Sequence, residues 1–154
     1  MEQKFAYKLE SLQTGIISEI VKSTGCQLYL ELGIESGNNI REVKKYCNNC
    51  IGVDIQDIRE FKDFEFHKTT TDDFFTRFEG HPNIIFIDAN HDIEQVKKDF
   101  INSLKCISEH GIIFLHDTDP HDEYLSNKLY CSDSYKIHEW LENTYSELNF
   151  IKYQ

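Results

Sequence analysis

Four side chains that can move a proton or bind a metal ion follow two apolar runs in the second half of the chain. Asp88 and His91 follow one run, and His116 and Asp117 end the next. Such runs predict buried parallel strands, whose carboxyl ends meet at one edge of a sheet, so we expect the four to lie together. A histidine can take a proton from a hydroxyl, whereas carboxylates can hold a hard divalent cation that lowers the hydroxyl's pKa. An alternative for Asp88 and His91 is to cap the following helix.

A glycine-spaced turn occurs earlier, in the stretch YLELGIESGNN. A dinucleotide-binding turn has the pattern G-x-G-x-x-G, and its second glycine lets the backbone approach a pyrophosphate. Here Gly33 and Gly37 are present, but Glu35 takes the middle place and Glu31 adds a second carboxylate. These charges repel phosphate, so the turn predicts a nucleoside without phosphates, preferably a cationic one. The alternative is that the glycines serve only the geometry of the chain.

An acidic residue at a suitable spacing from the glycine turn supports the prediction of a nucleoside ligand. Asp54 ends the second apolar run, 21 residues after Gly33 (54 − 33). This is about the spacing at which a carboxylate accepts hydrogen bonds from both ribose hydroxyls. A cationic adenosine compound without phosphate describes S-adenosylmethionine.

The elements that must position these residues alternate along the chain. A helix is expected up to Gly25, and another from Asp92 with Gly111 as its stop. Strands alternating with helices predict a parallel α/β sheet with right-handed crossovers. We expect one domain of 1–154, with an N-terminal helix in 1–25, a ligand-binding core in 27–117, and a C-terminal helix and last strand in 118–154. The expected strands are 27–32, 50–55, 64–68, 83–88, 112–117 and 147–154, and the shorter helices are 39–47, 71–78 and a segment around Trp140.

Composition limits the partners. The 154 residues carry a net charge of -11, which repels nucleic acid and anionic membrane surfaces, so we expect neither as a partner. The N-terminus is charged and has no apolar signal-peptide core, which predicts a cytoplasmic protein. The five cysteines are an odd number, and we interpret them as reduced thiols.

Five motifs in order resemble the class I S-adenosylmethionine-dependent methyltransferases: ELGIESG, GVDI, TTTDDFF, IFIDANH and GIIFLHD. The order is most similar to the family-24 type, which is related to metal-dependent O-methyltransferases acting on sugars and catechols. The resemblance implies a Rossmann-like, doubly wound, mostly parallel sheet in a single domain. It also implies a set of cofactor-binding residues: Glu31, Gly33, Glu35, Ser36, Gly37, Asn39, Asp54, Ile55, Thr71, Asp72 and Asp88.

The resemblance also implies a reaction, methyl transfer to the oxygen of a small hydroxylated acceptor such as a sugar. His91 falls where relatives place a basic residue near the acceptor, which makes His91 and Asp88 the catalytic candidates. Asp88 and Asp117 match two of the positions that hold the cation, Mg²⁺ or Mn²⁺, in metal-dependent relatives, and His116 is the third candidate ligand. The sequence departs from the pattern because His116 and Thr118 stand where relatives carry an acid and an amide.

The C-terminus departs as well, since relatives close the sheet with a seventh, antiparallel strand and this chain stops at about the sixth. An unpaired sheet edge favours self-association, so a homo-oligomer is expected. Two other functions are left open. One is a non-catalytic or truncated module that binds an adenosine cofactor, and the other is a nucleotide-dependent oxidoreductase, which Glu35 disfavours.

Overall fold

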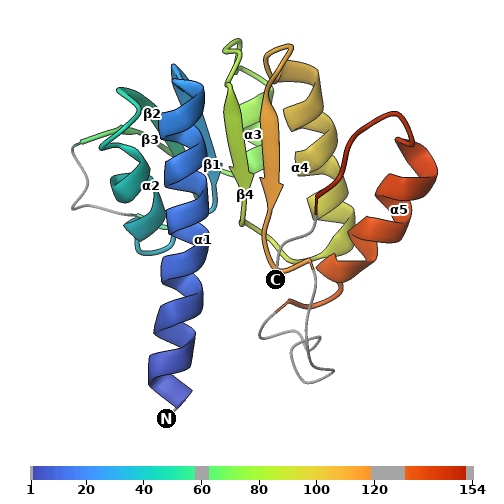
Figure 1. The fold of residues 1–154 in the computed structure, drawn as a ribbon. Helices are drawn as coiled ribbons and strands as arrows, with labels where there is room; N and C mark the ends of the chain where they lie inside the picture. Colours follow the sequence, from blue (N-terminus) through green and yellow to red (C-terminus); the bar gives the residue numbers. More distant parts are fainter. Residues whose placement is uncertain (1, 58–62, 119–130, 152–154) are drawn as a thin grey trace.

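A computed structural model describes residues 2–57, 63–118 and 131–151 (Figure 1). Its strands are β1 (Leu28–Leu32), β2 (Asn49–Asp54), β3 (Glu65–Lys68), β4 (Ile84–Ile87) and β5 (Ile112–Leu115). Its helices are α1 (Glu2–Thr24), α2 (Asn38–Val43), α3 (Thr71–Phe75), α4 (Ile93–Cys106) and α5 (Ile137–Thr144), with a short 3-10 helix, η2 (Ser134–Lys136), before α5. No helix in these residues is long and apolar enough to cross a membrane.

The five strands form one sheet in the order β3-β2-β1-β4-β5, and all four strand pairs are parallel. All four residues of the interior strand β4 are buried, as an uninterrupted apolar run predicts for a strand covered on both faces. The chain runs from β1 outward to β3 and then returns to β4 beside β1. This reversal opens a crevice beyond the carboxyl ends of β1 and β4, where ligands of such sheets bind.

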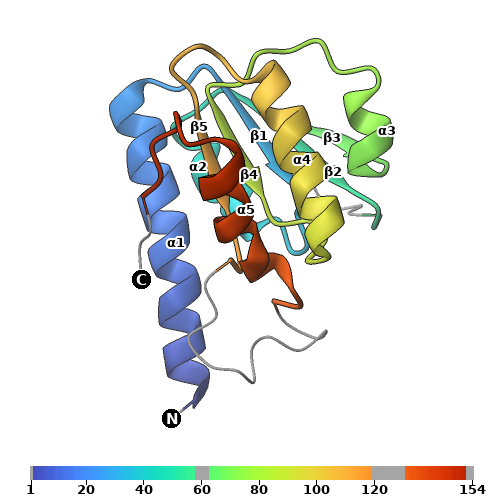
Figure 2. The same cartoon turned by 90° about the vertical axis from the view of Figure 1, so that its right-hand side faces the viewer.

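Helices cover both faces of the sheet (Figure 2). Alternate residues of a strand point to opposite faces, so each face has its own apolar core. On one face Ile17 and Val21 of α1 pack with Ile40 and Val43 of α2. On the other face Phe74 of α3 shares a core with residues of α4 and α5, among them Val96, Phe100, Ile137 and Leu141. The predicted doubly wound, Rossmann-like α/β sheet is therefore confirmed.

The predicted last strand is wrong for its described part. Residues 147–151 form a turn and an extended tail, and residues 152–154 lie outside the described residues. Leu148 N–H donates to Tyr145 O, and Ile151 is 89% exposed, so this segment has neither a strand's pairing nor its burial. The described sheet thus has five strands instead of about six, and it lacks the seventh strand of its relatives.

Three helix ends also differ from the prediction, and one of them is that of α3, which stops at Phe75 instead of at 78. Helix α2 stops at Val43 because the following bonds tighten, with Lys45 N–H donating to Glu42 O. Helix α4 ends at Cys106, and Ile107 is already extended, so Gly111 is not its stop. Gly111 is instead needed for close packing, since an added Cβ would lie 2.3 Å from Ile107 Cγ1.

Candidate active site

A cavity of about 580 Å³ opens at the carboxyl ends of the strands. Its wall combines the turn after β1, the end of β2, the segment that enters α3, and the residues after β4 and β5. These segments are far apart in the sequence, and only the strand order brings them together. The cavity therefore lies at the reversal of strand order, as predicted.

The turn after β1 needs glycine for two reasons. Gly33 has φ +83°, and an added Cβ would lie 2.1 Å from the backbone oxygen of Asp88. Gly37 has φ +68° and begins α2. Glu35 also has a positive φ, 48°, which is uncommon for a residue with a side chain. Such strain is typical of a functional turn.

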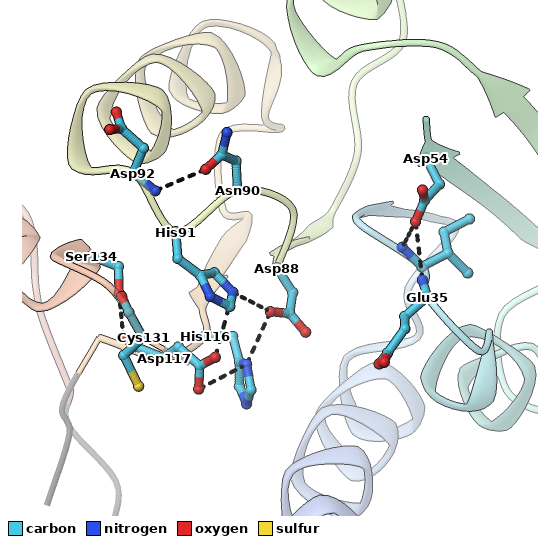
Figure 3. Close-up of polar contacts among 11 residues, drawn as sticks. Glu35, Asp54, Asp88, Asn90, His91, Asp92, His116, Asp117, Cys131 and Ser134 are labelled. Carbon is cyan, nitrogen blue, oxygen red and sulfur yellow. Dashed lines mark hydrogen bonds and ion pairs between the residues drawn. The ribbon is translucent and has the colours of Figure 1, made fainter. Parts of the chain in front are cut away.

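Asp54 holds this turn in place (Figure 3). Its Oδ2 accepts hydrogen bonds from Ile34 N–H at 2.8 Å and Glu35 N–H at 3.0 Å. Its Oδ1 accepts from Gln56 N–H at 2.8 Å. Asp54 thus links the ends of β1 and β2, and its carboxylate lies in the cavity wall, where it can also accept hydroxyl hydrogens.

Glu31 lies behind the turn instead of in the cavity wall. It is 1% exposed, and its Oε2 accepts from Tyr29 Oη and from Asn39 Nδ2, each at 2.6 Å. Burial raises the pKa of Glu31 to about 8, although the bonds from Tyr29 and Asn39 lower it. Glu31 is therefore protonated at neutral pH. Its contact with Asn39 connects β1 to the start of α2, behind the turn.

Two histidines and two aspartates contact one another through hydrogen bonds and ion pairs at the ends of β4 and β5 (Figure 3). His91 Nε2 lies 3.4 Å from both Asp88 Oδ1 and Asp117 Oδ2. His116 Nδ1 lies 3.0 Å from Asp88 Oδ1 and 3.3 Å from Asp117 Oδ1. Asp117 has φ +52°, a strained conformation that Ser134 supports by donating its hydroxyl to Asp117 O at 2.5 Å. The four predicted residues do lie together.

Burial and the neighbouring charges have opposite effects on the pKa values of His116 and Asp88. Burial favours a neutral His116, but hydrogen bonds and ion pairs with Asp117 and Asp88 raise its pKa to about 10. Burial likewise opposes an ionised Asp88, yet His116 and His91 hold the pKa of its carboxyl below the usual value. At neutral pH His116 is therefore an imidazolium between two carboxylates, and it cannot accept a further proton.

The same residues can hold a cation. One ligand atom from each of Asp88, His116 and Asp117 lies within 4.8 Å of the others. Two carboxylate oxygens and one imidazole nitrogen form a donor set that suits Mn²⁺ and, less well, Mg²⁺, provided that His116 loses its proton. The residues therefore fit a divalent metal ion.

The capping alternative for Asp88 and His91 is wrong, because Asp92 performs that role. Asp92 Oδ1 accepts from Glu94 N–H and Gln95 N–H at the start of α4. Asn90 in turn accepts from Asp92 N–H. Asp88 and His91 are left to contact each other and the cavity.

The cavity wall includes most of the predicted site residues. Of the predicted set, the wall contains Gly33, Glu35, Asp54, Ile55, Thr71, Asp72, Asp88, His91, His116 and Asp117. It does not contain Glu31, Ser36, Gly37 or Asn39, which lie in or behind the turn. Sequence reasoning missed Gln95, which lies at helical spacing from a buried Asp99. The i, i+4 spacing of these two polar residues was the available signal.

The sequence matches the family model of a methyltransferase domain over residues 30–118, more than half of the chain. The chain belongs to this family. The resemblance to class I S-adenosylmethionine-dependent methyltransferases is thereby confirmed, and the chain is a methyltransferase domain. No curated protein matches the sequence.

Solved structures share the fold of this methyltransferase domain. A putative caffeoyl-CoA O-methyltransferase from Staphylococcus aureus superposes with a TM-score of 0.71 at 13% identity, over 92% of this chain and 80% of that one. An O-methyltransferase from Bacillus cereus in complex with SAH gives 0.67 at 14% identity, over 87% and 70%. A sugar N-methyltransferase from Streptoalloteichus gives 0.56 at 10% identity, over 66% and 46%. The chain thus spans between 46% and 80% of these proteins.

Proposed function

We propose that this domain transfers the methyl group of S-adenosylmethionine to a hydroxyl oxygen of a small acceptor such as a sugar. The observation that carries the proposal is the pair of carboxylates, Asp88 and Asp117, around the His91 imidazole in the cavity wall. A hydroxyl must lose its proton to become a good nucleophile, whereas a neutral amine attacks through its lone pair. A base held between two carboxylates therefore favours oxygen over nitrogen as the acceptor atom.

The residues of the cavity wall support a position for the cofactor. The ribose hydroxyls donate to Asp54, and the base lies toward Ile55, Thr71 and Asp72. The amino-acid end lies against the turn that begins at Gly33. The sulfonium then faces the carboxylates after β4 and β5, which favour its positive charge.

In the transfer step the acceptor oxygen attacks the methyl carbon, and the bond between sulfur and methyl breaks to leave a neutral thioether. His91 takes the hydroxyl proton, and Asp88 and Asp117 stabilise the imidazolium that forms. His116 is the less suitable base, because its raised pKa keeps it protonated at neutral pH. His116 lies 3.0 and 3.3 Å from the two carboxylates, whereas His91 lies 3.4 Å from each of them.

Mg²⁺ or Mn²⁺ is the alternative means of activating the hydroxyl. Asp88, His116 and Asp117 would hold the ion, which would act as a Lewis acid that lowers the pKa of the acceptor. If the ion is required, a chelator abolishes activity and Mn²⁺ restores it. Full activity in excess chelator removes the metal from the proposal.

The test is formation of S-adenosylhomocysteine from S-adenosylmethionine with a panel of sugars and catechols, followed by mass spectrometry of the methylated product. Binding without turnover on any acceptor would support the alternative of a non-catalytic or truncated module. Tighter binding of NAD than of S-adenosylmethionine would support the oxidoreductase. Methylation of an amine but of no hydroxyl would contradict the choice of oxygen.

Location and assembly complete the proposal. A cytoplasmic location is supported by the absence of disulfides among the described residues, where Cys26, Cys47, Cys50, Cys106 and Cys131 are all free thiols. Self-association is supported by the position of β5 at an edge of the sheet. The partners we propose are a small acceptor and a second copy of the chain, without nucleic acid or membrane.

A further inference from the structure

Gln95, in the first turn of α4, contributes an amide group to the cavity wall. Its Nε2 lies within hydrogen-bond distance of three acceptors, Thr71 Oγ1 at 3.2 Å, Asp72 Oδ1 at 3.0 Å and Asp99 Oδ1 at 3.1 Å, which share its two hydrogens. Thr71 and Asp72 begin α3, and Asp99 lies one turn further along α4. The amide nitrogen therefore joins α3 and α4 at the end of the cavity where the proposed cofactor places its base.

The carboxyl groups of Asp72 and Asp99 determine whether the nitrogen or the oxygen of the Gln95 amide faces them. The hydrogen bond from Gln95 and the nearby Lys98 hold the pKa of Asp72 below its usual value, so Asp72 is an acceptor only. Asp99 is fully buried, and burial raises its pKa, but even its protonated form keeps a carbonyl oxygen for Gln95. A flipped amide would place Gln95 Oε1 against the Asp72 carboxylate, where two acceptors repel each other.

This orientation leaves the carbonyl oxygen of Gln95 for a ligand. None of the described residues donates a hydrogen bond to Gln95 Oε1, whereas Nε2 has three acceptors. Asp72 is engaged on both oxygens, because its Oδ2 lies 3.5 Å from Lys98 Nζ. The contacts of Nε2 thus fix the orientation of the amide at this end of the cavity, and Gln95 Oε1 receives no hydrogen bond from the described residues.

We infer that Gln95 selects adenine by accepting a hydrogen bond from the exocyclic amino group of the base. The inference rests on the proposed use of S-adenosylmethionine and names the residue that reads its base. A hypoxanthine base carries an oxygen in place of that amino group, so two acceptors would face each other. Asp72 and Asp99 act as positioning residues because they prevent the amide from flipping to suit the oxygen.

The experiment is calorimetric titration with S-adenosylhomocysteine and with S-inosylhomocysteine, which differ in that group and in the hydrogen that hypoxanthine carries on N1. For the natural chain we expect the adenine compound to bind at least about tenfold more tightly, as for one lost hydrogen bond with added repulsion. Gln95→Met keeps the side-chain length but removes the acceptor, so its two affinities should agree within about twofold. The control is Glu94→Met, which places methionine on the exposed side of the same helical turn and should keep the full ratio.

Each outcome has a defined meaning. Equal affinities in the natural chain overturn the inference while leaving the proposed function intact, and this comparison does not depend on a variant that folds. Full discrimination by a folded Gln95→Met chain also overturns it. If the natural chain binds neither compound, the proposed function fails and the inference fails with it.

Discussion

At the scale of single residues, Asp88 connects the two halves of the site. Its backbone oxygen is the atom that Gly33 approaches, and its carboxylate accepts from both His91 and His116. A shift of β4 would therefore move the glycine turn and the histidines together. In the proposed reaction Asp88 would set the position of the cofactor relative to His91, and methyl transfer requires that both be correctly placed.

His91 can be separated from cofactor binding by mutation. Replacing His91 with alanine should lower kcat by about 10²–10⁴-fold, as expected for a lost general base, while leaving the affinity for S-adenosylhomocysteine nearly unchanged. Steady-state kinetics and calorimetry on the same preparation measure the two effects. His110→Ala, a histidine outside the cavity wall, serves as the control. A variant that loses cofactor binding would show that His91 is part of the cofactor's pocket wall, and one that stays fully active would remove it as the base.

Glu31 makes a prediction about stability and pH. Its folded-state pKa, about 8, lies above its ordinary value of 4.5, so the folded chain retains a proton that the unfolded chain releases between these values. The free energy of unfolding should therefore fall as pH rises from about 5 to 8, by up to about 1.4 kcal/mol per pH unit from this group. Glu31→Gln mimics the protonated form and should lose this slope. Urea denaturation of both chains at several pH values, with the two slopes compared, measures it; equal slopes would contradict the prediction.

At the scale of elements, apolar runs and glycine spacing predicted the five strands and the cluster at the ends of β4 and β5. They could do so because burial on both faces demands an uninterrupted apolar strand, and parallel strands place their ends together. The segment after 147 was misread because apolar residues alone do not show whether a strand has a neighbour to pair with. The role of Gln95 depends on its contacts with Thr71 and Asp72 of another helix, which its local i, i+4 spacing from Asp99 does not reveal.

The turn after β1 can be tested as an element. Gly33→Ala should abolish cofactor binding and destabilise the fold, by roughly 1–3 kcal/mol from backbone strain alone. The physical reasons are the positive φ and the 2.1 Å approach of the new Cβ to Asp88 O. Gly15→Ala is the matched control, because nothing lies within 4 Å of its Cβ and alanine favours helix α1. Thermal unfolding and calorimetry measure both effects, and a Gly33→Ala chain with unchanged affinity would show that the turn does not contact the cofactor.

At the scale of the whole molecule, the net charge and the sheet topology both make the cavity acidic. The net charge is -11, and the cavity wall carries five carboxylates, on Glu35, Asp54, Asp72, Asp88 and Asp117, but no lysine or arginine among the residues that line it. Only His91 and His116 can offset them there. The strand order gathers acidic residues from the ends of all five described strands, or from the segments after them, into one cavity. This concentrates the negative potential that a cationic ligand would encounter.

This field predicts a difference between the substrate and product forms of the cofactor. S-adenosylmethionine carries a sulfonium charge that S-adenosylhomocysteine lacks, so raising the salt concentration should weaken its binding more. The screening length falls from about 10 Å at 0.1 M to about 3 Å at 1 M salt, which leaves the sulfonium with only its nearest carboxylates. Calorimetric titration of both compounds across this range measures the ratio of their affinities. Because both contain the same nucleoside, other effects of salt cancel in this ratio. We expect the ratio to shift toward S-adenosylhomocysteine as salt rises. A constant ratio would mean that the carboxylates around His91 and His116 are neutralised within the cluster, and that the sulfonium gains nothing from the acidic cavity.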